Sequence, residues 1–214
     1  MINNRTESLI NAKRLARLIM IFWCNTALEF MNDPKMLSAD KCLLLVVDIQ
    51  DAFLNHIEQM DQVIKRSRIM IEAAKLLDLP LIATEQYPQA LGRTVKVLRD
   101  ALGDIRYYDK VCFSCCGDET IKKAIIDSSR SQILMVGIET HVCVLQTAFN
   151  LLEMDKQVFI ASDAVSSRRQ NDTEIALHRL QQQGVIITTT ETAIMEMTAS
   201  SKHPAFREIS RLIK

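Results

Sequence analysis

The sequence predicts a three-layer α/β/α fold, in which helices cover both faces of a doubly wound, mostly parallel sheet of six strands. Short apolar runs alternate with segments of about 10 to 15 residues that carry apolar residues at helical spacing. The run from Cys42 to Val47 is continuously apolar, which is typical of a strand covered on both faces. Alternation of this kind produces a parallel sheet between two helical layers.

Six strands are expected, each a short apolar run that ends at a charged residue, a glycine or the next helix. Their expected ranges are 42–47, 81–84, 105–112, 133–136, 157–161 and 185–188. A loop is expected at 85–92. The helical segments are 63–77, 119–128, 140–154, 172–183 and a short terminal one at 206–213. Pro80 closes the first of these helices, and Gly184 is expected to cap the fourth.

Composition places this chain of 214 residues among ordinary globular proteins, with 48% hydrophobic and 24% charged residues. Basic and acidic residues number 26 each, so the net charge of +0 gives no indication of a nucleic-acid or membrane partner. The six cysteines follow no paired spacing, which favours reduced thiols and a cytoplasmic location.

Residues 1–37 are expected to be an extension ahead of a domain that spans 38–214. Three basic residues between positions 13 and 17 precede an apolar run at 18–24. That run is too short for a transmembrane helix, which needs about 20 apolar residues. Three interpretations stay open: an appended amphipathic helix, a presequence that would allow an organellar location, or an upstream start codon that adds non-native residues.

The segment 133–149, ILMVGIETHVCVLQTAF, holds a candidate nucleophile. An apolar strand stops at Gly137, and a turn then delivers Cys143 to the start of a helical pattern. The free N–H groups and the dipole of a helix N-terminus would stabilise a thiolate there and lower the pKa of Cys143. This pattern describes a nucleophile elbow with sulfur in place of the serine oxygen. A buried structural cysteine is the alternative interpretation.

Two further candidates close other strands of the predicted sheet. Asp48 ends the first strand, and Lys110 lies near the end of the third. Ligands of open parallel sheets bind at the carboxyl ends of the strands, where the strand order reverses, so both could meet Cys143 in one pocket. The carboxylate could take the thiol proton while the ammonium keeps the carboxylate ionised and oriented. Taken singly, Asp48 also suits a helix cap and Lys110 a solvated loop.

Other groups of polar residues give weaker indications. Cys112, Cys115 and Cys116 have metal-like or redox-like spacing but lack the second pair that a zinc site needs. His141 is two residues from Cys143 and would not face it on a helix. The stretch 166–169 (SSRR) suits either an anion site or a solvated loop. No glycine-rich phosphate loop is present, so no nucleotide cofactor is expected.

Three segments, VVDIQDAF, YDKVCFS and GIETHVCVLQTA, resemble the signature segments of the isochorismatase-like cysteine hydrolases. That family includes nicotinamidases, N-carbamoylsarcosine amidases and isochorismatases. The resemblance runs from about residue 41 to the C-terminus. Together with GIETHVCVLQTA, the segments TEQYPQALGRTV and HPAFREISRLIK are most similar to the isochorismatase domain-containing proteins, a branch whose substrates are mostly undefined.

The resemblance implies a role for each candidate. Cys143 would attack a carbonyl, Asp48 would take the thiol proton, and Lys110 would bridge the two electrostatically. A cis peptide bond at Ile138–Glu139 would turn the Glu139 N–H toward that of Cys143, and these two N–H groups would form an oxyanion hole. The substrate pocket is expected to include Gln50, Phe53, Tyr87 and Ile138.

Two departures from the family pattern narrow the expected chemistry. Nicotinamidases carry an Asp-x-His metal site after the second strand, where this chain has Gln86-Tyr87-Pro88, so neither a metal site nor a cofactor is expected. Isochorismatase activity is also not expected, because the motifs resemble a different branch. Glu139 stands where nicotinamidases have a small residue, and its carboxylate is expected to point toward a neighbouring loop or subunit.

These inferences predict a metal-independent cysteine hydrolase of a small amide or related carbonyl compound, acting through a thioester. An alternative is a catalytically weak family member that acts as an interaction or regulatory protein. A third hypothesis is thiol-based redox chemistry at Cys143 with a nearby cysteine. The expected partners are a small-molecule substrate and, by family resemblance, further copies of the chain, without nucleic acid and without stable membrane insertion.

Overall fold

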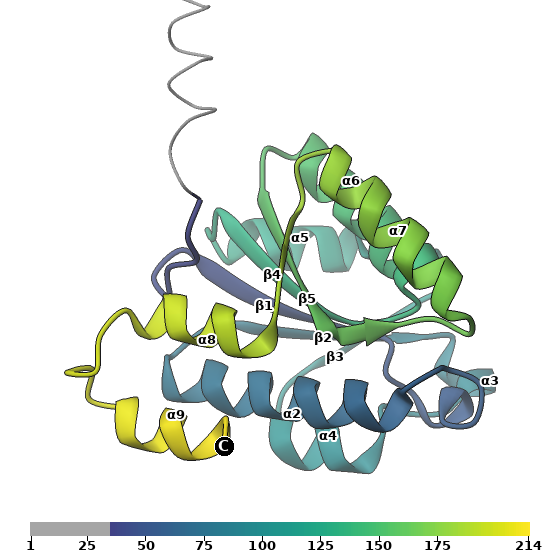
Figure 1. Cartoon of the computed structure of the whole chain (residues 1–214). Helices are drawn as coiled ribbons and strands as arrows, with labels where there is room; N and C mark the ends of the chain where they lie inside the picture. The colour runs from purple at the N-terminus through teal and green to yellow at the C-terminus, as the bar shows by residue number, and fades with distance from the viewer. Residues whose placement is uncertain (1–34) are drawn as a thin grey trace, which may run out of the picture. The chain divides into compact units, whose positions relative to one another are not determined.

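A computed structural model describes residues 35–214 of the protein, so the interpretations of the first 34 residues lie outside the described part. Six strands form one sheet in the order β3-β2-β1-β4-β5-β6, and every neighbouring pair is parallel (Figure 1). The predicted fold class is confirmed. The strands are β1 (Cys42–Val47), β2 (Leu81–Gln86), β3 (Tyr107–Lys110), β4 (Gln132–Ile138), β5 (Gln157–Ser166) and β6 (Ile186–Thr188).

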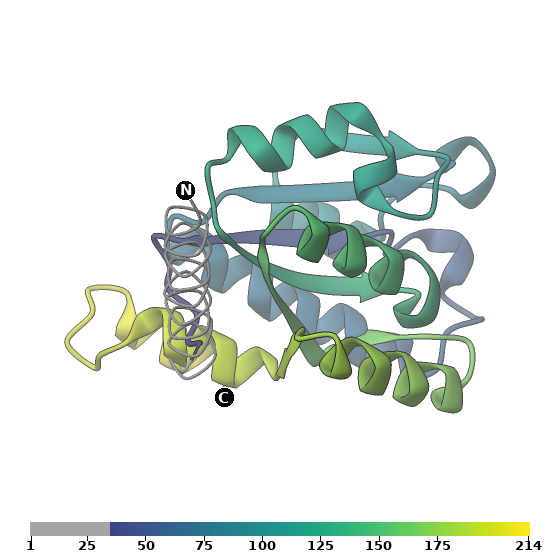
Figure 2. The ribbon, with the colours of Figure 1, turned by 90° about the horizontal axis from the view of Figure 1, so that it is seen from above.

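Two helical layers cover the sheet, as the views from the side and from above show (Figures 1 and 2). One layer comprises α2 (Met60–Leu76), α4 (Lys96–Leu102), α8 (Thr190–Thr198) and α9 (Phe206–Leu212). The other comprises α5 (Glu119–Asp127), α6 (Leu145–Glu153) and α7 (Gln170–Gln182). Short helical turns are α3 (Pro88–Leu91), η1 (Asp51–Phe53), η2 (Cys115–Gly117) and the π-helical η3 (Thr140–Val144).

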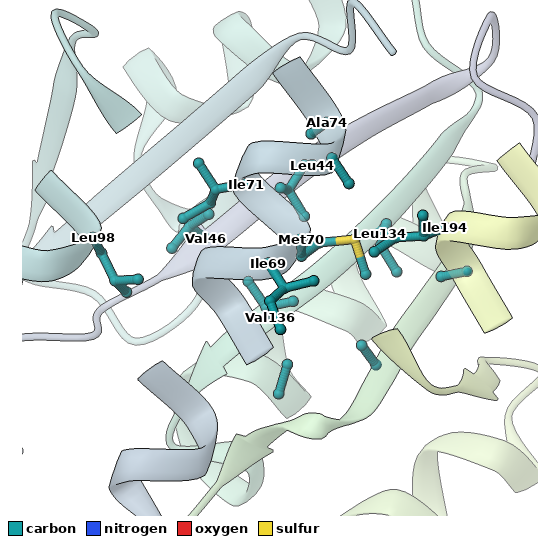
Figure 3. Close-up of a cluster of buried hydrophobic side chains, with 14 of the residues drawn as sticks. Leu44, Val46, Ile69, Met70, Ile71, Ala74, Leu98, Leu134, Val136 and Ile194 are labelled. Carbon is teal, nitrogen blue, oxygen red and sulfur yellow. The ribbon is translucent and has the colours of Figure 1, made fainter. Parts of the chain in front are cut away.

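The core is divided between the two faces of the sheet by strand alternation. Leu44 and Val46 of β1 point to the α2 side, whereas Leu43 and Leu45 point to the α6 side. Because every residue of β1 is buried, the strand needs apolar side chains at all positions, which is why it reads as an unbroken apolar run. Figure 3 shows the α2 side, where Ile69, Met70, Ile71 and Ala74 pack against Leu44, Val46, Leu134 and Val136.

Several elements differ from the sequence-based expectation. The expected loop at 85–92 instead completes β2 and then forms α3. The strand expected to end at 161 continues to Ser166, because its polar Asp163 accepts hydrogen bonds from the N–H (2.7 Å) and hydroxyl (2.9 Å) of Thr190. Helices α4 and α8 were not expected, although the Thr189 cap of α8 and its buried Ala193, Ile194 and Met197 follow ordinary helical rules.

Gly137 lets β4 lie close against β1. Its φ of +126° is in the region that favours glycine, and an added Cβ would overlap the Val47 carbonyl oxygen.

We expect Gly137→Ala to lower the free energy of unfolding by about 3 kcal/mol or more, through steric overlap and backbone strain. Gly184 is the matched control, because its φ is +92° and its Cβ would meet nothing within 4 Å. Urea denaturation should show a clearly larger loss at Gly137 than at Gly184, and equal losses would contradict the packing argument.

Within residues 35–214, no helix has both the length and the apolar character needed to cross a bilayer. Residues 37–214 form one compact unit of structure. The expected extension before residue 38 stays a prediction, since residues 1–34 are not described.

Candidate active site

Asp48, Lys110 and Cys143 come together at the carboxyl ends of the strands. The ammonium of Lys110 donates a hydrogen bond to Asp48 Oδ2 (2.6 Å) and lies 3.6 Å from the Sγ atom of Cys143. The side chain of Lys110 is 0% exposed and that of Asp48 is 2% exposed. A buried, hydrogen-bonded cluster of a carboxylate, an ammonium and a thiol is therefore present in the fold.

The strand order explains this meeting. β1 and β4 are neighbours at the point where the order of the strands reverses. Asp48 follows β1 directly, and Cys143 lies in the turn η3 that follows β4. Asp48 has a φ of +52°, and its N–H donates to the Thr84 carbonyl (3.2 Å), so the chain turns sharply at the strand end. Lys110 reaches the same point from β3, two strands away.

Further acceptors hold the Lys110 ammonium in place. It donates to the side-chain oxygen of Gln86 (2.7 Å) and to the backbone carbonyls of Phe113 (3.1 Å) and Cys112 (3.3 Å). Burial disfavours the charged ammonium, but the Asp48 carboxylate and nearby thiols outweigh this and raise the pKa of Lys110 above its ordinary value. Lys110 is therefore a cation whose direction is fixed by several acceptors.

Two residues of this cluster were missed by sequence reasoning. The Thr84 hydroxyl donates to Asp48 Oδ1 (2.7 Å), and the Gln86 amide links Lys110 to the Val111 carbonyl (2.9 Å). Both belong to β2, at whose end the carboxyl-end rule could have directed attention to them. Gln50, expected in the pocket, does not line it: it is fully buried, and its amide binds the backbone of Gln86 and Gly92.

Cys143 lies within the π-helical turn η3, two residues before α6 begins, rather than in the first turn of an α-helix. Burial, followed by the neighbouring Asp48 carboxylate, raises the pKa of the Cys143 thiol well above its ordinary value. A lowered pKa was expected from the sequence, and this expectation was wrong because burial, and with it desolvation, is not visible in local sequence. The resting sulfur is thus a protonated thiol next to a carboxylate able to accept its proton.

The turn before Cys143 is held by contacts with the end of β5. The Ile138–Glu139 peptide bond is cis. The Glu139 carboxylate pairs with the Arg168 guanidinium (2.9 Å), so it is directed toward the loop after β5. His141 Nδ1 lies 2.9 Å from the Ser167 hydroxyl, which directs its ring to the same loop. Neither the carboxylate of Glu139 nor the imidazole of His141 is hydrogen-bonded to Cys143 in this arrangement.

A cavity of about 670 Å³ opens beside the Cys143 sulfur. Three expected pocket residues, Phe53, Tyr87 and Ile138, line it together with Asp48 and Cys143. The remaining lining residues are Ala52, His56, Gln86, Ala90, Leu91, Phe113, Glu139, Val142 and Arg168. The cavity is large enough for a small organic molecule and leads to the thiol.

The other thiols do not extend this site. Among residues 35–214, no group of three or more His, Cys, Asp or Glu side chains is placed to hold a metal ion. Cys115 is fully buried, with its Sγ 3.9 Å from the Thr84 hydroxyl, and burial raises the pKa of Cys115 to about 12. A thiol that stays protonated reacts slowly with oxidants, which gives little support to a redox pair with Cys143.

The fold and the site define a three-layer α/β/α protein with a buried Asp–Lys–Cys cluster beside a cavity. Residues 42–192 match the family model of the Isochorismatase domain, and the chain belongs to this family, as the sequence resemblance predicted. Its fold is that of an isochorismatase-family hydrolase.

Relatives agree with this membership. Isochorismatase family protein 1A of Dictyostelium discoideum is 42% identical over 84% of this chain and 89% of its own length. Isochorismatase domain-containing protein 2A of Mus musculus is 39% identical over 82% of this chain and 84% of its own length. The solved structure of MAR1 Ribonuclease from Caenorhabditis elegans is 38% identical with a TM-score of 0.80 and covers 84% of this chain and 92% of that chain.

Proposed function

We propose that the protein is a metal-independent cysteine hydrolase that acts on a small amide or a related carbonyl compound. One observation carries this proposal: the thiol of Cys143, the carboxylate of Asp48 and the ammonium of Lys110 meet at the end of a cavity of about 670 Å³. A nucleophile within reach of a base, with a third group that orients the base, is the arrangement that covalent hydrolysis requires.

The first half-reaction forms a thioester. Asp48 takes the Cys143 proton as the sulfur attacks the carbonyl carbon, and Lys110 stabilises the charge at Asp48 and holds its direction. The backbone N–H groups of Glu139 and Cys143 are the proposed oxyanion hole for the tetrahedral intermediate. Asp48 then returns the proton to the leaving nitrogen, so that ammonia or an amine departs.

The second half-reaction restores the enzyme. Water enters the position that the leaving group vacates, and Asp48 takes one of its protons as the oxygen attacks the thioester carbonyl. Collapse of this second intermediate breaks the C–S bond and releases a carboxylic acid. The sulfur recovers its proton from Asp48, which returns both groups to their resting state.

The test uses p-nitrophenyl acetate as an activated acyl donor. We expect a burst of p-nitrophenolate, followed by steady turnover, with an acetyl group on Cys143 detected by mass spectrometry of quenched samples. Cys143→Ala should abolish the burst, whereas Cys42→Ala, which alters a buried thiol at the start of β1, should keep it. Turnover should survive dialysis against a chelator. Burst and turnover that persist in Cys143→Ala would reject the proposal.

The same protein preparation tests two other functions, RNA cleavage and a role as an interaction or regulatory protein. The related Caenorhabditis elegans protein is described as a ribonuclease, so single-stranded RNA is incubated with the wild type and with Cys143→Ala. RNA cleavage that requires Cys143, without acyl transfer, would replace the proposed function. A folded protein that forms no acyl adduct and cleaves no RNA would favour the alternative of an interaction or regulatory protein.

We also propose that the protein forms a homo-oligomer. Phe113 and Tyr87 line the cavity and have exposed fractions of 54% and 51%, and Val111, two residues before Phe113, is 78% exposed. Exposed apolar side chains that gather at one place often mark a protein interface. Light scattering should give a mass above that of one chain, and a monomer mass would contradict this.

A further inference from the structure

The charges around the cavity are arranged in opposite pairs. Asp48 is paired with Lys110 at 2.6 Å, and Glu139 is paired with Arg168 at 2.9 Å. Lys110 does not line the cavity: its side chain is 0% exposed, and its ammonium donates to Asp48, which does line the cavity. The lining therefore presents two carboxylates, the exposed His56 and one guanidinium, whose Nε–H is engaged by Glu139.

An anionic group needs an unpaired cation or several free donors to replace its water shell. The guanidinium of Arg168 keeps free N–H groups, but an anion that approached it would also approach the Glu139 carboxylate. Deeper in the cavity, an anion beside the Cys143 sulfur would meet the Asp48 carboxylate. The Lys110 ammonium, 3.6 Å from that sulfur, is already hydrogen-bonded to Asp48 and to three further acceptors. His56 is the other lining residue that can carry positive charge, and it is exposed.

Apart from the Gln86 amide and the Tyr87 hydroxyl, most of the remaining lining is apolar. Phe53, Leu91, Phe113 and Val142 present side chains without charge, together with the small Ala52 and Ala90. Such a wall gains free energy by covering an apolar body of a ligand, and it loses free energy by removing water from a charged one.

From this pairing of charges we infer that the substrate is a small carbonyl compound without any carboxylate, phosphate or other anionic group, and that its carbonyl is attached to an apolar body. The inference rests on the proposed function for the reaction at the carbonyl, and it adds the class of compound that can reach Cys143. The Glu139–Arg168 ion pair disfavours the binding of anions, because the Glu139 carboxylate offsets the positive charge of Arg168 that would otherwise attract them.

The experiment measures selectivity at Cys143 without requiring turnover. Iodoacetate is an anion, iodoacetamide is its neutral counterpart, and N-phenyl iodoacetamide is neutral with an apolar body. Each is reacted at about pH 8.5, the ordinary pKa of a free thiol, and modification of Cys143 is quantified by peptide mass spectrometry. Every rate is divided by the rate of the same reagent with N-acetylcysteine.

Normalised rates should fall in the order N-phenyl iodoacetamide, iodoacetamide, iodoacetate. We expect the iodoacetate-to-iodoacetamide ratio to be at least about tenfold lower at Cys143 than at the free thiol. Because both reagents attack the same thiolate, the pKa of Cys143 cancels from this ratio. A ratio within about twofold of the free thiol would overturn the inference, as would slower reaction of the apolar reagent than of iodoacetamide.

Two variants assign the effect to the ion pair. Glu139→Gln keeps the shape of the side chain and releases Arg168, so the ratio should rise by at least about fivefold. Arg168→Gln leaves the carboxylate unpaired, so the ratio should fall further. An unchanged ratio in both variants would show that the Glu139–Arg168 pair does not cause the selectivity, and would overturn its proposed role in excluding anions.

The outcomes separate this inference from the proposed function. Established hydrolysis of p-nitrophenyl acetate together with ready reaction of iodoacetate would overturn only the substrate class. Exclusion of iodoacetate together with the absence of acyl transfer would reject the hydrolase and leave the charge selectivity of the cavity standing.

Discussion

Asp48→Asn should make the Cys143 thiol easier to ionise and, at the same time, slow turnover of p-nitrophenyl acetate by about 10²–10⁴-fold. After burial, the Asp48 carboxylate is the next largest reason why the pKa of Cys143 is raised. Removing this negative charge lowers the pKa, so the midpoint of the pH profile for alkylation by iodoacetamide moves to lower pH. An amide, however, cannot accept the proton of the Cys143 thiol or of the attacking water, so both half-reactions slow.

The backbone and the chemistry both make asparagine a suitable replacement. Asp48 has a φ of +52°, and asparagine tolerates this left-handed conformation better than most residues. Asp51→Asn is the matched control, because it makes the same chemical change at an exposed side chain that lies 4.0 Å from Arg99. The control should leave unchanged both the pH profile of Cys143 alkylation and the turnover of p-nitrophenyl acetate. A shift of the alkylation midpoint to higher pH in Asp48→Asn, or unreduced turnover, would contradict the role of Asp48 as a base.

Lys110→Met should lower the free energy of unfolding by about 3–5 kcal/mol. The substitution keeps an aliphatic chain of similar length but leaves the buried Asp48 carboxylate without its cation, and it also deprives Gln86 of its hydrogen bond. Urea denaturation followed by circular dichroism measures the loss. Lys96→Met is the matched control: its exposed pair with Asp100 (2.7 Å) should contribute no more than about 1 kcal/mol.

A double variant shows whether the loss comes from the uncompensated charge. Lys110→Met combined with Asp48→Asn contains neither charge, so its loss should be smaller than the sum of the two single losses. Additive losses would mean that the contribution of Lys110 to stability does not depend on the Asp48 charge.

The pH dependence of stability offers a second check on Lys110. Its folded-state pKa is raised above 10.5, so the stability that it contributes is complete below this pH and is lost as the pH rises through the higher folded value. The difference between wild type and Lys110→Met should therefore shrink at strongly alkaline pH. A stability difference between wild type and Lys110→Met that grows with pH would contradict a raised pKa of Lys110.

Much of the fold could be predicted because its signals are local. The run Cys42–Val47 was expected with the bounds that β1 has in the structure, since full burial requires every residue to be apolar. β5 was expected to end five residues early, because Asp163 interrupts the apolar pattern and finds its partner only in Thr190, on α8. Polar residues that are satisfied by distant groups break the pattern on which sequence reasoning depends.

The sequence alone determined the family, the layered parallel fold and the three strand ends that carry a carboxylate, an ammonium and a thiol. The tertiary structure decided which atoms meet, because Lys110 is 62 residues from Asp48 and 33 from Cys143 along the chain. It also decided that the pKa of Cys143 is raised and that Gln50 is fully buried and does not line the cavity. The physical reason is that desolvation and Coulomb interactions depend on neighbours in space, and these neighbours are assembled only when the sheet forms.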